Sequence, residues 1–257
     1  MPLAFTRAVS PRLAECALTH LDRRPIDAAR AAEQHAAYEQ ALRQAGLTVQ
    51  RLAPLDDDPD AVFVEDTAIL LGRDAVICRP GSPSRAGETH STAEGLARHF
   101  TIHHLAEGTL DGGDVLRIGD TLYVGQSSRT DATGTRALAK VAEPIGYRVV
   151  PIELGRCLHL KTAVTFAGSD RDGRATILVN TDWVDPTLFV GMKPVPVPPA
   201  EPFAANCVRA VETLVFAAGS PLTAAMLRDR GFTVVEVDVS ELQKAEAGGT
   251  CMSLIAD

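Results

Sequence analysis

The stretch GLTVQRL, residues 46–52, places a glycine before a run in which β-branched or apolar residues stand at alternate positions. That alternation is typical of a strand with one buried face. The pattern returns as HFTIHHL (99–105), GYRVVPI (146–152) and GFTVVEV (231–237). These four stretches are the clearest indication of the fold, because they recur along the whole chain.

A helix is predicted before each of these strands. The helix-forming stretches cover residues 28–45, 87–98, 132–145 and 220–230. Pro144 should end the third of them near Glu143, because proline lacks the backbone donor and clashes with the preceding turn. Gly46, His99 and Gly231 stand where the helix before each of them should end.

The spacing of the strands predicts one further unit. Their starts are separated by 53, 47 and 85 residues, and the last spacing is close to two units. A fifth unit is therefore expected near residues 170–200, although the run PVPVPPAEP (194–202) cannot be helical. We interpret this region as a unit that has lost its helix. Five similar units predict a solenoid, a propeller or a closed ring.

The first halves of the units also agree. Residues 63–80 and 112–127 each contain two short strands joined by a tight turn with a glycine, at LGRD and IGDT. Each pair leads into a polar loop with an arginine, Arg85 or Arg129, before the helix. The unit is therefore strand–strand–helix–strand. We predict a single α/β domain over residues 1–257, a five-bladed propeller-like ring with outer helices and a central channel for a ligand.

Composition narrows the class of protein. The five cysteines are scattered without a CxxC pair, and MPLAFTRAVSPR at the N-terminus lacks the apolar core of a secretory signal. We therefore expect free thiols, a cytoplasmic location and no structural metal site. No apolar run approaches the ~20 residues of a membrane span. The net charge of −8 argues against nucleic acid and anionic membranes as partners.

Polar residues that could carry chemistry stand at corresponding places in the units. Carboxylates occur in DAVFVED (60–66) and LDGGD (110–114), a histidine in CLHLKT (157–162) and a cysteine in GGTCMSL (248–254). The last two stretches resemble strands, and at least one of the adjacent acids of DAVFVED is expected on an inward strand face. In a closed ring these stretches would meet in one cavity.

Each of these residues also has a purely structural interpretation. Cys251 could be a small buried hydrophobe, His159 a hydrogen-bonded core residue and Asp111 a turn residue. Arg85 and Arg129 could be solvated loop arginines.

The combination is more informative than its members. Carboxylates in a cavity indicate a cationic ligand. A thiol beside a histidine indicates nucleophilic catalysis, and arginines at the rim indicate that the ligand also carries a carboxylate. Gly248 and Gly249 would let such a ligand approach Cys251 closely. A small molecule with a cationic group at one end and a carboxylate at the other would suit these residues, and an arginine derivative is such a molecule.

At these residues the sequence resembles the dimethylarginine dimethylaminohydrolase family of the amidinotransferase superfamily. The resemblance implies a five-bladed ββαβ propeller, the pentein fold, in agreement with the repeat pattern. The matching segments run in family order from residue 18 to the end: LTHLDRRPID, EQHAAYEQAL, DAVFVEDTAI, RPGSPSRAGE, LDGGDVL, SSRTDATG, LHLKT, AANC and GGTCMSL.

The resemblance implies hydrolysis of Nω-methylated arginines, dimethylarginine and monomethylarginine, to L-citrulline and dimethylamine or methylamine. By motif, Cys251 matches the nucleophile, which forms a covalent thiouronium, and His159 the general acid/base. Asp66 and the catalytic Asp111 match the carboxylates that hold the guanidinium. Glu65 resembles the residue that supports the cluster around the histidine.

The remaining matches concern the amino-acid end of the substrate. Arg85 and Arg129 match arginines that bind the α-carboxylate, and Asp60, with the backbone carbonyl of Leu18, matches the α-amino contacts. Leu18 lies in residues 17–26, which resemble an active-site lid.

Some bacterial relatives carry glutamate in place of Asp111. The resemblance implies neither a metal nor an organic cofactor, whereas zinc on the Cys–His pair would inhibit. A homodimer is expected from apolar outer strands.

Two other functions stay open at this point. Another hydrolase of the superfamily, such as an arginine deiminase, would act on unmethylated arginine, but those enzymes are generally longer, with inserted helical segments. A non-catalytic propeller, like the ribosome anti-association factors of this architecture, would bind a partner and would not need the Cys–His–acid set.

Overall fold

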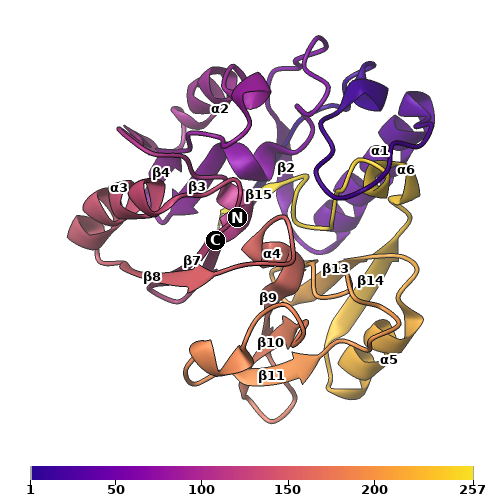
Figure 1. Cartoon of the computed structure of the whole chain (residues 1–257). Coiled ribbons are helices and arrows are strands. Elements are labelled where there is room, and N and C mark those ends of the chain that lie inside the picture. The colour runs from indigo at the N-terminus through magenta and orange to yellow at the C-terminus, as the bar shows by residue number, and fades with distance from the viewer. Residues whose placement is uncertain (1, 257) are drawn as a thin grey trace.

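The computed structural model describes residues 2–256, and its helices confirm the predicted repeat (Figure 1). The longest of them are α1 (Ala28–Gln44), α2 (Glu88–Leu96), α3 (Ala132–Ala142) and α5 (Pro221–Asp229), and α4 (Leu160–Ala163) and α6 (Ser240–Gln243) are single turns. Asp27 and Asp131 begin α1 and α3 by accepting hydrogen bonds from backbone amides of the first turn. Pro144 lies in the short 3₁₀ helix η5 (Glu143–Ile145), so α3 ends where proline was expected to end it.

Strands within residues 2–256 form five three-stranded sheets. In each sheet the middle strand is antiparallel to the first strand named and parallel to the third. This shared topology confirms the repeated unit. The sheets are β15 (Leu254–Ala256), β1 (Leu3–Thr6), β2 (Thr48–Arg51); β3 (Ala68–Leu71), β4 (Asp74–Ile77), β5 (Thr101–His104); β6 (Val115–Ile118), β7 (Thr121–Gln126), β8 (Arg148–Glu153); β9 (Val164–Ser169), β10 (Ala175–Val179), β11 (Lys193–Pro196); and β12 (Cys207–Ala210), β13 (Thr213–Ala217), β14 (Thr233–Val237).

The fourth unit lacks the helix that the others carry, as predicted. Between β10 and β11 the structure has only the 3₁₀ turn η6 (Pro186–Leu188) among its described residues. Pro194 and Pro196 lie in β11 at the edge of its sheet, where a missing backbone donor is tolerated.

The two predicted hairpins are also present. The turns Gly72–Arg73 and Gly119–Asp120 join β3 to β4 and β6 to β7. Both glycines have positive φ, 63° and 60°, which a two-residue hairpin turn requires and other residues rarely adopt.

Apolar clusters connect the sheets in chain order. In the described part of the chain, five clusters each combine side chains of two sheets. One joins Val208 and Val215 of the fifth sheet to Ala4 of the first. Because β15 pairs with β1 at Leu3–Phe5, the first sheet contains both ends of the described chain. Figure 1 shows α1, α2, α3 and α5 at the periphery of these sheets.

The prediction that the polar stretches are strands was wrong. Glu65 and Asp66 lie in the 3₁₀ helix η2 (Val64–Thr67), His159 precedes the short helix α4 (Leu160–Ala163), and Cys251 lies in a turn before β15. Local hydrogen bonds account for the difference. For example, the Thr67 hydroxyl donates to the Val64 carbonyl. Each strand begins only after its polar residues.

The helices found between residues 2 and 256 include none that is both long and apolar enough to cross a membrane.

Candidate functional site

A small cavity of about 30 Å³ brings together six of the nine residues singled out from the sequence. It lies where the loops before several of the sheets meet. Its lining consists of Ala17, Asp60, Phe63, Asp66, Arg85, Arg129, Leu158, His159, Ala245, Glu246, Ala247 and Cys251. Asp111, Glu65 and Leu18 lie around it instead of in its wall.

Cys251 is half-buried in the turn before β15. Its Sγ accepts a hydrogen bond from the Gly248 amide at 3.3 Å, and its carbonyl accepts one from the Glu65 amide at 3.1 Å. Burial raises the pKa of the Cys251 thiol to about 12, and the negative charges of Glu65 and Asp66 contribute. The thiol is therefore protonated at neutral pH, and a bound cation would favour the thiolate.

His159 is buried between two carboxylates. Its Nε2 lies 3.2 Å from Asp111 Oδ2 and its Nδ1 lies 3.8 Å from Asp66 Oδ1. Burial alone would lower the pKa of His159, but Asp66, Asp114 and Asp111 outweigh it and raise that pKa to about 9. The imidazole therefore carries a proton at neutral pH and can act as a proton donor.

Asp66 and Asp111 are each held by a backbone amide. Asp66 Oδ1 accepts from Gly113 at 3.1 Å, and Asp111 Oδ1 accepts from Gly81 at 2.7 Å. Burial would raise the pKa of Asp66, but the charges of His159 and Arg85 lower it overall. Both carboxylates are consequently available as fixed hydrogen-bond acceptors.

The same groups could hold a cation. Ligand atoms of Asp66, Asp111 and His159 lie within 4.8 Å of one another. A metal ion would have to displace the proton of His159, whereas a guanidinium could use the carboxylates without doing so. The donor set therefore suits an organic cation at neutral pH.

Arg129 lines the cavity and is less deeply buried than Arg85. Its side chain is 14% exposed, with Nη1 3.8 Å from Asp111 Oδ2 and Nη2 donating to Thr19 Oγ1 at 3.0 Å.

Arg85 differs from the expectation of a rim residue. It is buried in η3 (Pro83–Arg85), and its guanidinium donates to Asp66, to both oxygens of Glu88 and to the Phe63 carbonyl. A buried guanidinium is stable only when paired in this way, so Arg85 lies deeper than its loop position indicated.

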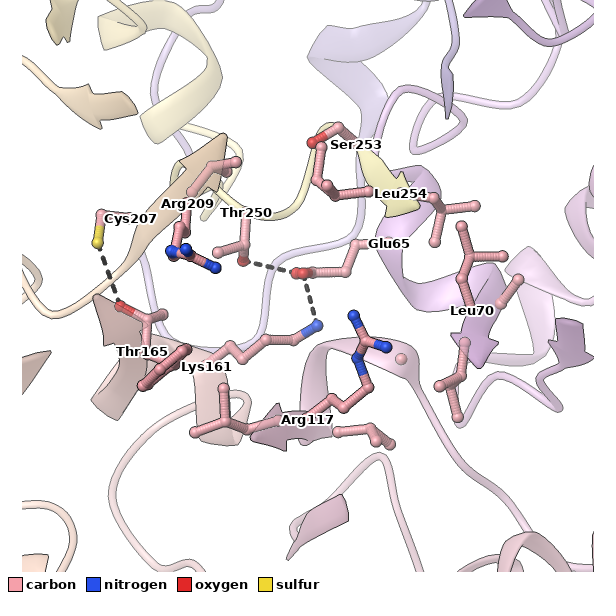
Figure 2. Close-up of a pocket in the computed structure, with 18 residues that line it drawn as sticks. Glu65, Leu70, Arg117, Lys161, Thr165, Cys207, Arg209, Thr250, Ser253 and Leu254 are labelled. Carbon is pink, nitrogen blue, oxygen red and sulfur yellow. Dashed lines mark hydrogen bonds and ion pairs between the residues drawn. The ribbon is translucent and has the colours of Figure 1, made fainter. Parts of the chain in front are cut away.

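Glu65 contacts both the turn of Cys251 and the segment that follows His159. Its Oε1 lies 2.6 Å from Lys161 Nζ and its Oε2 accepts from Thr250 Oγ1 at 2.6 Å (Figure 2). These residues line a second cavity of about 200 Å³, together with Arg117 and Arg209. Burial raises the pKa of Glu65, and Lys161 and Thr250 oppose that rise.

Asp60 binds the start of the loop of residues 17–26, which contains Leu18. Asp60 Oδ2 accepts from the Ala17 amide at 3.1 Å, and burial raises the Asp60 pKa. Leu18 is half-buried and packs on the cluster that joins the fifth and first sheets. Its neighbour Ala17 is the member of the loop that lines the cavity.

Three residues around the site were given no role from the sequence. Asp114 accepts from Ser127 and Thr130 hydroxyls, and burial raises its pKa to about 6. Asn206 contacts Thr250. Asp114 lies in LDGGD and Asn206 in AANC, so these two motifs could have indicated both residues.

Glu246 had no such signal, because its partners are more than 200 residues away. Its carboxylate accepts from the backbone amides of Thr19, His20 and Leu21 at 2.5–3.0 Å. Its own backbone has φ of 62°, an uncommon conformation for a residue with a side chain.

The repeated α/β units and the cavity with its thiol, imidazole and carboxylates indicate the class of a hydrolase with an α/β fold of the pentein type. Comparisons agree. Residues 19–170 match the family described as N,N dimethylarginine dimethylhydrolase, eukaryotic. The N(G),N(G)-dimethylarginine dimethylaminohydrolase of Streptomyces coelicolor is 42% identical over 254 residues, which cover 98% of this chain and 95% of that protein.

Two solved structures match equally well in shape. The Pseudomonas aeruginosa enzyme, as a Cys-to-Ser variant with citrulline, has a TM-score of 0.91 and 33% identity, with 98% of each chain covered. A His-to-Gly variant of dimethylarginine dimethylaminohydrolase, as an adduct with S-methyl-L-thiocitrulline, has the same score and identity over 99% of this chain and 100% of that one. The chain belongs to the dimethylarginine dimethylaminohydrolase family.

Proposed function

We propose that this protein hydrolyses Nω-methylated arginines to L-citrulline and dimethylamine or methylamine through a covalent intermediate on Cys251. The observation that carries the proposal is the convergence of Cys251, His159 and Asp66 on one cavity in a chain of this family. The citrulline complex and the thiocitrulline adduct of the relatives support the substrate class.

Asp66 and Asp111 hold the guanidinium in this proposal. Paired charge-assisted hydrogen bonds would orient its plane and keep the central carbon near sulfur. The cation also lowers the raised pKa of Cys251, so that the thiol releases its proton to solvent and the thiolate forms. Substrate binding thereby prepares its own nucleophile.

The reaction then proceeds in two halves. Sulfur attacks the guanidinium carbon, and His159 gives its proton to the departing methylated amine, which leaves a thiouronium on Cys251. The neutral imidazole takes a proton from water, whose oxygen attacks the same carbon. Collapse of this second adduct breaks the carbon–sulfur bond and releases citrulline. The scheme uses no metal and no organic cofactor.

Arg129 and Arg85 bind the α-carboxylate, and Asp60 with the Leu18 carbonyl binds the α-amino group. Arg129 supplies most of the carboxylate contact, because Arg85 is already paired with Asp66 and Glu88. The cavity of about 30 Å³ has room for only one or two water molecules. The loop of residues 17–26 therefore opens to admit a substrate and acts as a lid.

The five sheets close into one ring within a single domain, residues 1–257. The apolar clusters between consecutive sheets, including the one from the fifth sheet to the first, support closure, with the site at one end of a central channel. The protein acts in the cytoplasm on a small-molecule substrate, without a nucleic-acid or membrane partner, and forms a homodimer.

The test measures citrulline and the released amine with asymmetric dimethylarginine, monomethylarginine and arginine supplied separately. Citrulline with dimethylamine or methylamine from the methylated substrates is expected. Citrulline and ammonia from arginine alone would identify an arginine deiminase instead. No citrulline from any of the three would overturn the proposal in favour of a binding protein.

A further inference from the structure

We infer that Asn206 is a positioning residue that sets the turn of Cys251 against the segment of His159. The inference rests on the proposed roles of Cys251 and His159. Asn206 itself lies outside the wall of the small cavity, and its side chain makes its hydrogen bonds to Lys161 and Thr250. It acts on the reaction only through the segments that it connects.

The Asn206 amide bridges the two segments directly. Its side chain is buried just before β12, where Oδ1 accepts from the Thr250 amide at 2.8 Å. Its Nδ2 donates to Thr250 Oγ1 at 3.1 Å and to the Lys161 carbonyl at 3.0 Å. Thr250 adjoins Cys251, and Lys161 lies two residues after His159. One side chain therefore fixes the separation of the nucleophile and the acid/base.

The surrounding contacts leave this bridge a single arrangement. The Thr250 hydroxyl has one hydrogen and donates it to Glu65 (Figure 2). It must therefore accept from Asn206. Lys161 Nζ binds the other oxygen of Glu65, whose backbone amide holds the Cys251 carbonyl. Three separate segments are locked together, and rotation of the Asn206 amide would break the set.

Gly248 packs closely against the side chain of Asn206, which leaves no room for a larger residue. A Cβ at Gly248 would lie 2.4 Å from Asn206 Cγ, whereas a Cβ at Gly249 would meet nothing closer than 3.4 Å. The first glycine lets the turn pack on the amide of Asn206. We therefore assign Gly248 to packing, where the sequence had indicated access for a ligand.

The structure offers matched controls for both residues. Asn180 is also a buried asparagine, with Nδ2 donating to the Pro202 carbonyl and Oδ1 accepting from the Asp182 amide, but it holds a loop of the fourth unit. Gly249→Ala adds the same methyl group as Gly248→Ala one residue later. Each pair separates loss of position from loss of stability.

The experiment compares Asn206→Ala with Asn180→Ala for kcat, KM and Tm. Since misplacement by about 1 Å can cost on the order of 100-fold, Asn206→Ala should lower kcat ~10- to 100-fold with KM nearly unchanged. Asn180→Ala should lower Tm with kcat within about twofold of wild type. Unchanged kcat in Asn206→Ala, or equal losses in both variants, would overturn the inference.

Gly248→Ala and Gly249→Ala repeat the test with every hydrogen-bonding group retained. Gly248→Ala should lower kcat, whereas Gly249→Ala should not. The loss of kcat caused by Gly248→Ala should not add to that caused by Asn206→Ala, because Asn206→Ala removes the amide with which the new methyl group clashes. Additive effects, or equal effects of the two alanines, contradict the inference. This pair decides the question if Asn206→Ala does not fold.

The rate at which iodoacetamide alkylates Cys251, followed by mass spectrometry, needs no turnover. It should rise several-fold in Asn206→Ala, because the turn is freed, and stay constant in Asn180→Ala. An unchanged rate contradicts the positioning role. Failure of the proposed function would look different. In that case Cys251 of the wild-type protein would still be alkylated, but the protein would produce no citrulline.

Discussion

His159 Nε2 lies 3.2 Å from Asp111 Oδ2, and the other oxygen of Asp111 accepts a hydrogen bond from the Gly81 amide. The carboxylate is therefore fixed on one side by the backbone and holds the imidazole on the other. Because it also contributes to the raised pKa of His159, it links the geometry of the site to the protonation of its acid/base.

Asp111→Asn should lower the pKa of His159 by about one unit or more, since a negative charge in contact with the imidazole is lost. NMR titration of the His159 ring measures this shift. Asp74→Asn removes the carboxylate of another Asp–His pair, with His103, and serves as control. A pKa of His159 that stays near 9 in Asp111→Asn would refute this account of its cause.

Cys251→Ser should abolish turnover and leave substrate binding within a few-fold, because serine lacks a comparable nucleophile while the carboxylates remain. Turnover and calorimetric binding of a methylated arginine measure the two effects. Cys157→Ser, at the other half-buried cysteine, should keep its turnover. Steady citrulline production by Cys251→Ser would exclude Cys251 as the nucleophile.

The pKa of His159 predicts how stability depends on pH. Its folded value, about 9, lies above the ordinary 6.5, so the folded protein holds the proton more tightly. This stabilisation, of order 3 kcal/mol, is fully present below pH 6.5 and is lost as the pH rises through about 9. Urea unfolding of wild type and His159→Asn measures it. A stability difference that does not shrink between these pH values contradicts the prediction.

Glu246→Ala should release the loop of residues 17–26, because three backbone amides lose a charged acceptor worth about 1.5–3 kcal/mol for each bond. Amide hydrogen exchange of Thr19, His20 and Leu21 should accelerate at least ~10-fold. Glu236→Ala, which removes an exposed partner of Arg228, is the control. Equal exchange in wild type and Glu246→Ala would show that other contacts hold the loop.

The two arginines should respond differently to substitution. Arg85→Ala leaves the buried carboxylates of Asp66 and Glu88 without their partner and should cost about 3–5 kcal/mol of stability. Arg129→Ala, nearer the surface, should mainly raise KM for substrates with an α-carboxylate. Thermal unfolding and steady-state kinetics separate the effects. Equal loss of Tm in both variants would contradict the assignment.

Most of the fold could be predicted from the sequence because the signals that define it are local. Alternation in GFTVVEV, helical stretches such as residues 28–45, and the effect of Pro144 act within a few residues. The helices and strands accordingly lie where they were expected. The polar stretches were misassigned as strands, because their backbone is turned by local hydrogen bonds such as that of Thr67 and also by bonds to side chains of other units, such as that of the Leu160 amide to Asp114.

The candidate site was recognisable only in part. Motifs such as LDGGD and GGTC identified residues that line or adjoin the cavity, but they indicated neither the burial of Arg85 nor the partners of Glu65. Glu246 carried no signal in its own segment. The contacts of these residues join segments that are distant along the chain.

The sequence by itself determined the repeated unit, the loss of one helix and the chemical groups available to the site. Only the tertiary structure decided which groups face the cavity, how far the pKa values of Cys251 and His159 are displaced, and that Asn206 joins their segments. The physical reason is range. Secondary structure follows from neighbouring residues, whereas burial, charge interactions and hydrogen bonds between units exist only after the units have packed together.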